Sequence, residues 1–150
     1  MYHTIRPKRP LTYKGFYESG FSCYTKSELK KACEISETMG ITITDYPRTD
    51  TQEILKYLSC RLGLSCIVIH LVDRACCRHG GTYYEVNGPY CTSPILTTGT
   101  DDNFNVSFLY GFIQNFSFSD CLYMGCATSG YYVCNGKGPT LPELIDFLIL

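Results

Sequence analysis

Blocks of hydrophobic residues with helical or alternating spacing predict a chain that mixes helices and strands. Thr25-Lys26-Ser27-Glu28 is a capping box, and the apolar residues after it recur at near-helical spacing, which predicts a helix over about 25–39. Residues 41–44 alternate and are β-branched, as in a half-buried strand. A second cap-like start lies at 50–53. It precedes a helical stripe made of Ile54, Leu55, Leu58 and Leu62.

The middle of the chain predicts strands around a tight turn. Residues 66–72 form an apolar run whose residue types favour a strand, although periodicity alone does not separate a buried strand from a buried helix. Gly80-Gly81 predicts a turn, and residues 82–86 predict a strand that stops at Asn87-Gly88-Pro89. A loop rich in Thr, Ser, Gly and Pro over 90–101 follows.

The last third of the chain predicts two helices and one more strand. An aromatic stripe over 102–116 predicts a helix whose aromatic face lies in the core, with Asp101-Asp102 capping its start. Residues 131–134 predict a late strand, and a capping box at 140–143 predicts a short closing helix. This mixture of elements indicates the α+β class.

Composition narrows the class of protein further. With 150 residues and 45% hydrophobic residues, the chain is expected to form one domain, 1–150, with a sizeable core. A net charge of −1 argues against a strongly electrostatic nucleic-acid binder, and 14% aromatic content argues against disorder. The longest apolar runs are too short to cross a membrane, and the start has no apolar stretch typical of a secretory signal.

The ten cysteines are expected to be mostly reduced and buried as small hydrophobic residues. A zinc site is the alternative, because Cys76, Cys77 and His79 offer three ligands and Cys60 or Cys66 a fourth. Structural zinc sites prefer paired clusters such as C-x2-C, and none occurs here.

Three short motifs, taken in order, carry a resemblance to a known family. They are Tyr2-His3-Thr4, the segment GFSCYT at 20–25 before a helix, and TYYEVNGP at 82–89 before an aromatic helix; the run 67–74 adds an apolar stretch that ends in Arg. Together they resemble the ADP-ribosyltransferase fold, and in particular short bacterial ADP-ribosyltransferase-like proteins. The resemblance implies an α+β fold of split sheets with flanking helices, and NAD as cofactor.

The resemblance also implies roles for single residues. His3 would bind the adenosine-side ribose, the backbone near Thr4 would hold the nicotinamide amide, and Tyr24 would stack on the nicotinamide ring. Glu85 would accept a hydrogen bond from the ribose 2′-hydroxyl and stabilise the positive charge that develops on the ribose. It lies one place after Tyr84, where the family has its Asp. The other residues implied for cofactor binding are Arg6, Phe21, Arg74 and Tyr84.

The implied activity is mono-ADP-ribosylation of a protein or nucleic-acid acceptor, in the cytoplasm or in a host cell as a delivered effector. No membrane contact is expected, and an inhibitory partner protein would fit such an activity. Two other interpretations stay open. Cys23 before a helix, with His79, resembles a viral papain-like cysteine protease. A degenerate transferase-like domain could instead bind a nucleotide or a protein without turnover.

Overall fold

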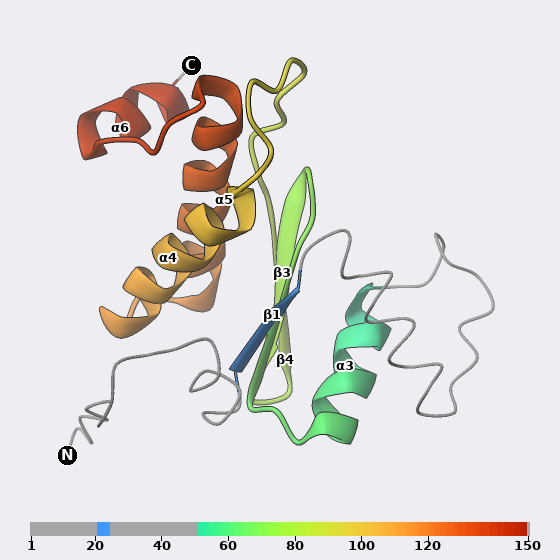
Figure 1. Cartoon of the computed structure of the whole chain (residues 1–150). Coiled ribbons are helices and arrows are strands. Elements are labelled where there is room, and N and C mark those ends of the chain that lie inside the picture. The colour runs from blue at the N-terminus through green and yellow to red at the C-terminus, as the bar shows by residue number, and fades with distance from the viewer. Residues whose placement is uncertain (1–20, 25–50, 150) are drawn as a thin grey trace.

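A four-stranded sheet forms the centre of the protein (Figure 1). The computed structural model describes residues 21–24 and 51–149. The strand order is β1-β2-β3-β4, with β1 parallel to β2 and the other neighbours antiparallel. The strands are β1 (Phe21–Tyr24), β2 (Cys66–His70), β3 (Arg74–His79) and β4 (Thr82–Asn87).

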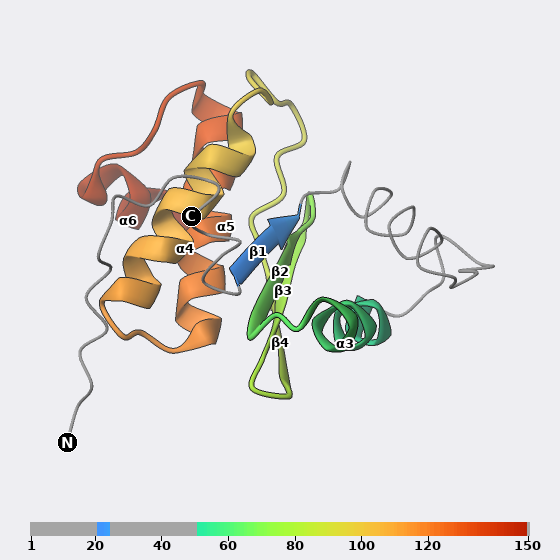
Figure 2. The ribbon, with the colours of Figure 1, turned by 60° about the horizontal axis from the view of Figure 1, so that its bottom comes forward.

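Helices cover both faces of this sheet. In both views α3 lies on one side of the sheet, and α4 and α5 lie together on the other (Figures 1 and 2). Helix α6 packs beyond the sheet against α5. The helices are α3 (Thr51–Leu62), α4 (Thr100–Ile113), α5 (Phe118–Asn135) and α6 (Leu141–Ile149).

Strand β2 shows why the apolar run at 66–72 is unbroken. Successive side chains of a strand point to opposite faces. Ile67 and Ile69 enter a core cluster with α3, whereas Cys66 and Val68 enter the cluster with α4 and α5. Because both faces are covered, every residue of β2 is buried. The same alternation sends His70 toward α4 and α5, where the candidate site lies.

Small residues bring α5 close to its neighbours. A Cβ on Gly125 would lie 2.6 Å from the Phe104 ring of α4, and a Cβ on Gly130 would lie 2.6 Å from Pro89 in the loop after β4. Contacts this short have no room for a methyl group. The buried face of α5 is therefore built from Gly, Ala, Cys and Ser as much as from large apolar side chains.

The buried face of α5 explains why the strand predicted over 131–134 is wrong. Residues 131–134 lie in α5 and not in a strand. The sequence Tyr-Tyr-Val-Cys has β-forming residue types, but intrinsic strand preference is weak against tertiary packing. Ser117 caps the helix by accepting a hydrogen bond from the Asp120 N–H (3.1 Å). Many residues on the buried face of α5 are small, so the sequence shows only a weak helical pattern of hydrophobic residues there.

Other predicted elements are confirmed. Helix α3, strands β2 and β4 and the Gly80-Gly81 turn lie where the pattern places them. The prediction that the aromatic stripe over 102–116 lies in the core is only half right. Phe104 and Phe108 are buried, whereas Phe112 and Phe116 are exposed. The helix expected over 25–39 and the strand expected over 41–44 lie outside the described residues.

The predicted fold class is wrong. An ADP-ribosyltransferase-like pair of split sheets was expected, but the described strands form a single sheet enclosed between helices. The physical reason is β2, which is covered on both faces and ties β1 and β3 into one hydrogen-bonded ladder.

The eight cysteines from Cys60 to Cys134 are free thiols, in agreement with the reduced state expected. Cys60 is exposed, but Cys66, Cys76, Cys77, Cys121 and Cys126 are buried. Burial raises the pKa of Cys76 to about 12. In residues 51–149 and 21–24 no group of three His, Cys, Asp or Glu side chains could hold a metal. Cys76 and Cys77 are neighbours in a strand and point to opposite faces of the sheet.

The described helices give no candidate for a membrane span, since none is both long and apolar enough.

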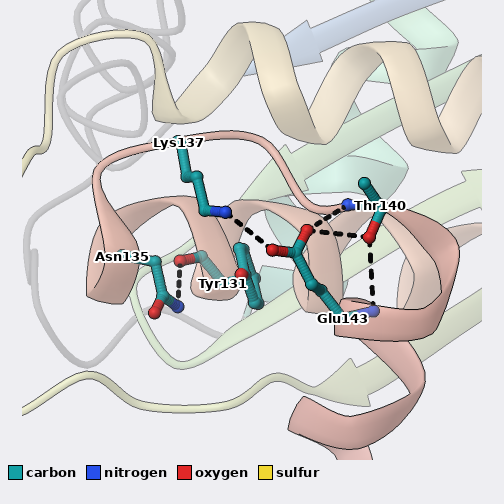
Figure 3. A network of polar contacts seen from close by, with 5 residues as sticks. All are labelled: Tyr131, Asn135, Lys137, Thr140 and Glu143. Carbon is teal, nitrogen blue, oxygen red and sulfur yellow. Dashed lines mark hydrogen bonds and ion pairs between the residues drawn. The ribbon is translucent and has the colours of Figure 1, made fainter.

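The closing helix α6 begins with the predicted capping box (Figure 3). The Glu143 carboxylate accepts hydrogen bonds from the Thr140 N–H and hydroxyl (2.8 Å each), and Lys137 Nζ lies 2.6 Å from its other oxygen. The bond from Lys137, followed by those from Thr140, lowers the pKa of Glu143 to about 2. Both donors favour the charged carboxylate.

We expect Glu143→Gln to lower the melting temperature at pH 6, and the difference from the native protein to shrink as the pH falls. The pKa of Glu143 is depressed on folding, from 4.5 to about 2, so its contribution is complete above the unfolded value and is lost as the pH falls through the folded one. Thermal melts between pH 6 and pH 3 measure this. Asp146→Asn, on the same helix, is the control, and a pH-independent difference for Glu143→Gln would contradict the prediction.

Candidate functional site

The N-terminus of α4 leaves two backbone donors without a partner. Gly99 precedes the helix in the left-handed conformation (φ 88°), and no side chain caps the helix. The Thr100 N–H bonds to the Thr97 carbonyl (3.3 Å), and the Asn103 N–H bonds to the Gly99 carbonyl (3.2 Å). Between them, the N–H groups of Asp101 and Asp102 have no backbone or capping partner within the described part of the chain. Free N–H groups at a helix N-terminus are suited to bind an anion.

The loop before α4 is held rigidly in place. Tyr132 of α5 donates its hydroxyl to the Thr98 carbonyl (2.9 Å), and the Thr100 hydroxyl donates to the Thr97 carbonyl (2.6 Å). The Asn103 side chain donates to the Gly99 carbonyl (2.9 Å). These bonds occupy the carbonyls of Thr97, Thr98 and Gly99 and fix the loop that leads into the helix.

The two acidic residues in the first turn of α4 differ in their surroundings. Asp101 Oδ1 lies 3.4 Å from His70 Nδ1, and half of the Asp101 side chain is exposed (50%). Asp102 is exposed and has no side-chain partner among the described residues. The expectation that this pair caps the helix is wrong, because the cap position belongs to Gly99. Asp102 is therefore the carboxylate available to a ligand.

His70 connects β2, α4 and α5. Its side chain is 8% exposed, and its ring stacks on Phe104 with the centroids 4.1 Å apart. Nε2 lies 3.2 Å from the hydroxyl oxygen of Ser129, which is itself buried. Both ring nitrogens thus have polar neighbours, with Ser129 on one side and Asp101 on the other.

Those residues expected to bind NAD that the structure describes do not gather at this site. Glu85 lies on β4 beside Tyr83, which donates a hydrogen bond to it. That side of β4 faces α3, because Tyr83 packs in the α3 cluster. Tyr84 has the opposite orientation and stacks on Phe118 of α5. A one-residue offset on a strand separates these two side chains onto opposite faces.

The other expected residues are placed as follows. Arg74 begins β3 and lies 3.8 Å from the neighbouring Asp73 carboxylate. Phe21 and Tyr24 are the two ends of β1, in register with Cys66 and Ile69 of β2. His3, Thr4 and Arg6 lie outside the described residues.

The protease alternative gains no support. Cys23 lies within strand β1, opposite Val68, and so within the described residues it does not begin a helix that would lower a thiol pKa. His79 ends β3, is in register with Cys66, and its ring stacks on Phe118 (4.4 Å between centroids).

Comparisons with known proteins identify the family. The profile of the prokaryotic ketohexokinase family matches residues 32–149. The chain belongs to the prokaryotic ketohexokinase family. It is 35% identical over 78 residues to a ketohexokinase from Haloferax volcanii, an alignment that covers 52% of this chain and 19% of that enzyme. The chain therefore aligns with about a fifth of the curated relative.

Two solved kinase structures share the fold of this chain. Ribokinase from Thermotoga maritima superposes with a TM-score of 0.69 at 13% identity, over 96% of this chain and 47% of that one. A nucleoside kinase from Methanocaldococcus jannaschii, described as an archaeal member of the ribokinase family, gives a TM-score of 0.61 at 15% identity, over 89% and 41%. The chain spans less than half the length of either structure.

These findings overturn the ADP-ribosyltransferase hypothesis and, with it, NAD as cofactor, an ADP-ribose acceptor and the effector role. The motifs behind the resemblance are only a few residues long, and such short matches arise readily in a chain with 13 tyrosines and 13 glycines.

Sequence reasoning missed the start of α4 as a site. The signal was present in Thr97-Thr98-Gly99-Thr100-Asp101-Asp102, where a glycine precedes two acidic residues at the beginning of a helix. A loop and a cap explained that pattern equally well. The unpaired N–H groups, which distinguish an anion site from a cap, are visible only in the structure.

Proposed function

We propose that this protein takes part in ATP-dependent phosphorylation of a sugar, most specifically a ketohexose, and that the N-terminus of α4 binds the phosphoryl group being transferred. Membership of the prokaryotic ketohexokinase family supports the reaction class and the substrate. The observation that carries the proposal is the pair of unpartnered N–H groups at Asp101 and Asp102, next to an available carboxylate.

Electrostatics favours a phosphate at this position. The N-terminus of a helix carries a partial positive charge and points its free N–H groups toward an anion. Phosphoryl transfer depends mainly on positioning and on stabilising charge on the phosphoryl oxygens. Two free backbone donors in the first turn of α4, behind a loop fixed by side-chain hydrogen bonds, can provide such stabilisation.

Asp102 is the proposed general base. As the sugar hydroxyl oxygen attacks the γ-phosphorus, its proton passes to the Asp102 carboxylate and the bond from the γ-phosphorus to the bridging oxygen breaks, so that ADP leaves. Asp101 is less suited to this role because its carboxylate already faces His70.

The phosphoryl donor in this proposal is ATP. A divalent cation bound with it would neutralise charge on the phosphates. The described residues contain no group of three metal-binding side chains. A cytoplasmic location, where ATP is available, remains part of the proposal.

A binding and turnover assay tests the proposal. The purified 150-residue protein is mixed with ATP, magnesium and fructose, and ADP release is followed with and without the sugar. Fructose-dependent ADP release, together with ATP-induced changes in the amide signals of Thr100 to Asp102, is the expected result. Absence of ATP binding would overturn the proposal.

We expect Gly99→Ala to weaken ATP binding and to cost about 1–2 kcal/mol of stability. The left-handed conformation strains any residue with a Cβ, and this Cβ would also lie 3.1 Å from the Tyr132 hydroxyl that holds the loop. Titration calorimetry and urea unfolding measure the two effects.

Gly63→Ala is the matched control for this variant. Gly63 is also left-handed (φ 63°), but a Cβ there meets nothing within 4 Å. It should lose similar stability and keep its ATP affinity. Equal loss of ATP affinity in both variants would mean that Gly99 acts only through general stability.

A further inference from the structure

We propose that Cys91 and Cys134 form a redox-sensitive pair of thiols, which a low-molecular-weight disulfide such as oxidised glutathione converts to a disulfide bond. That bond would fasten the loop after β4, residues 88–99, to the C-terminal end of α5. The pair is independent of the proposed phosphate site, and its reaction uses neither ATP nor a sugar. The loop lies along α5 (Figure 1) and brings the two cysteines together.

Backbone contacts hold this loop against α5. The N–H groups of Ile95 and Leu96 both bond to the Val133 carbonyl (2.9 and 3.4 Å). Carbonyls in the last turn of a helix have no partner inside the helix, so the loop satisfies one of them. At the start of the loop, Pro89 packs so closely on α5 that a Cβ on Gly130 would lie 2.6 Å from its ring. The segment between these two contacts therefore runs along the helix.

Cys91 and Cys134 meet within that segment. Cys134 follows Gly130 by four residues, so the two lie on the same face of α5. A hydrogen bond joins the side chains of Cys91 and Cys134. Both thiols are free and only half-buried. Sulfur atoms in such contact need only a short approach to reach the roughly 2.05 Å of a disulfide bond.

Accessibility separates this pair from another thiol contact. Cys77 has a side-chain hydrogen bond with Cys66, but both of these side chains are buried in the core cluster between the sheet and the α4 and α5 helices. A reagent as large as glutathione cannot reach them in the folded protein. Cys60 is exposed and lies on α3, across the sheet from α5, so it serves as a control for simple thiol exposure.

The reaction is a thiol–disulfide exchange in two steps. The Cys91 thiolate attacks one sulfur of oxidised glutathione, so that a mixed disulfide forms and one glutathione thiolate leaves. Cys134 then loses its proton and attacks the Cys91 sulfur, which releases the second glutathione. Overall the two protein thiols lose two electrons and two protons, and one oxidised glutathione is reduced to two glutathione thiols.

The surroundings of Cys134 support this order of steps. Burial, followed by the hydrogen bond with Cys91, raises the pKa of Cys134 to about 11. Cys134 is therefore a protonated thiol at neutral pH, and it attacks a disulfide in solution slowly because the thiolate is the nucleophile. Once Cys91 carries glutathione, its sulfur is held beside Cys134. This high local concentration offsets the small thiolate fraction.

The bond should stabilise the fold and restrain the loop. It closes a segment of about 40 residues and so removes conformational freedom from the unfolded chain. We expect the oxidised protein to melt roughly 5–10 °C higher than the reduced protein. The amide hydrogens of Ile95 and Leu96 should exchange at least about tenfold more slowly, because the loop no longer separates from the Val133 carbonyl.

Mass spectrometry identifies the bond directly. The reduced 150-residue protein is incubated with oxidised and reduced glutathione at pH 8, and the remaining thiols are blocked with iodoacetamide. Chymotrypsin cleaves after Tyr90 and Tyr132, so Cys91 and Cys134 begin or nearly begin separate peptides that hold no other cysteine. These two peptides joined by a disulfide are the expected result. Their yield should fall at least about tenfold in 8 M urea, because only the fold holds the sulfurs together.

Three variants test the roles of the two cysteines. Cys134→Ser should accumulate glutathione on Cys91, since the second step lacks its nucleophile. Cys91→Ser should carry little glutathione on Cys134, because burial still keeps that thiol protonated. Cys60→Ser should form the bond and show the same rise in melting temperature as the native protein.

Two results would overturn the proposal. One is folded native protein in which Cys91 and Cys134 stay unlinked even in excess oxidised glutathione. The other is a linked pair that forms equally well in urea, because the fold would then contribute nothing to the reaction. ATP binding is measured on the reduced protein, so its absence would remove the phosphate site without affecting this pair.

Discussion

Replacing Asp102 with asparagine is expected to lower kcat for sugar phosphorylation by about 10³-fold, because asparagine cannot take the hydroxyl proton. The KM for the sugar should change little, since the amide keeps the size and hydrogen-bonding reach of the carboxylate. Affinity for ATP should be kept or should rise, because the change removes a negative charge beside the helix N-terminus. Fructose-dependent ADP release at saturating ATP measures the first effect, and titration calorimetry measures the last.

Asp120→Asn is the matched control. Asp120 also lies in the first turn of a helix, α5, but its carboxylate bonds to the Ser117 hydroxyl that caps that helix (2.6 Å). Its loss should leave turnover unchanged apart from a small loss of stability. An Asp102→Asn protein that keeps more than a tenth of the native kcat would show that another group accepts the proton.

The largest effect on stability is expected from Phe104→Ala, at about 3–5 kcal/mol. Phe104 is fully buried (0% exposed), stacks on His70 and fills the space left by Gly125. Close packing of α4 against α5 prevents the cavity from collapsing fully. Urea unfolding followed by circular dichroism measures this change, with tyrosine fluorescence as a second probe because the chain has no tryptophan.

Val106→Ala provides the comparison on the same helix. Val106 is 68% exposed, so its truncation should cost less than about 0.5 kcal/mol. A Phe104→Ala protein that loses less than about 1 kcal/mol would mean that α4 and α5 rearrange to fill the space. In that case the stacking on His70 could not be what holds the imidazole beside Asp101.

Part of the candidate site could be predicted from the sequence. The Gly99-Thr100-Asp101-Asp102 pattern and the helix after it are both visible in the sequence. The partners of that helix start are not, because His70 precedes Asp101 by 31 residues and Tyr132 follows Thr98 by 34. Nothing in the local sequence indicates that these segments meet.

The resemblance to ADP-ribosyltransferases failed for a related reason. Its motifs were compared by order along the chain, whereas a shared site requires the residues to converge in space. Glu85 and Tyr84 show the difference, since they are adjacent in the sequence but lie on opposite faces of β4. The kinase family was found from similarity over most of the chain, which does not depend on a few short motifs.

The sequence by itself determined the local elements whose signals are short-range: the amphipathic α3, the glycine turn between β3 and β4, the apolar strand β2 and the capped α6. Backbone conformation and hydrogen bonding between near neighbours set these elements. The tertiary structure alone decided that 131–134 is helical, that both faces of β2 are covered, and that His70 meets Asp101. These features depend on contacts between distant segments, where close packing outweighs local preference.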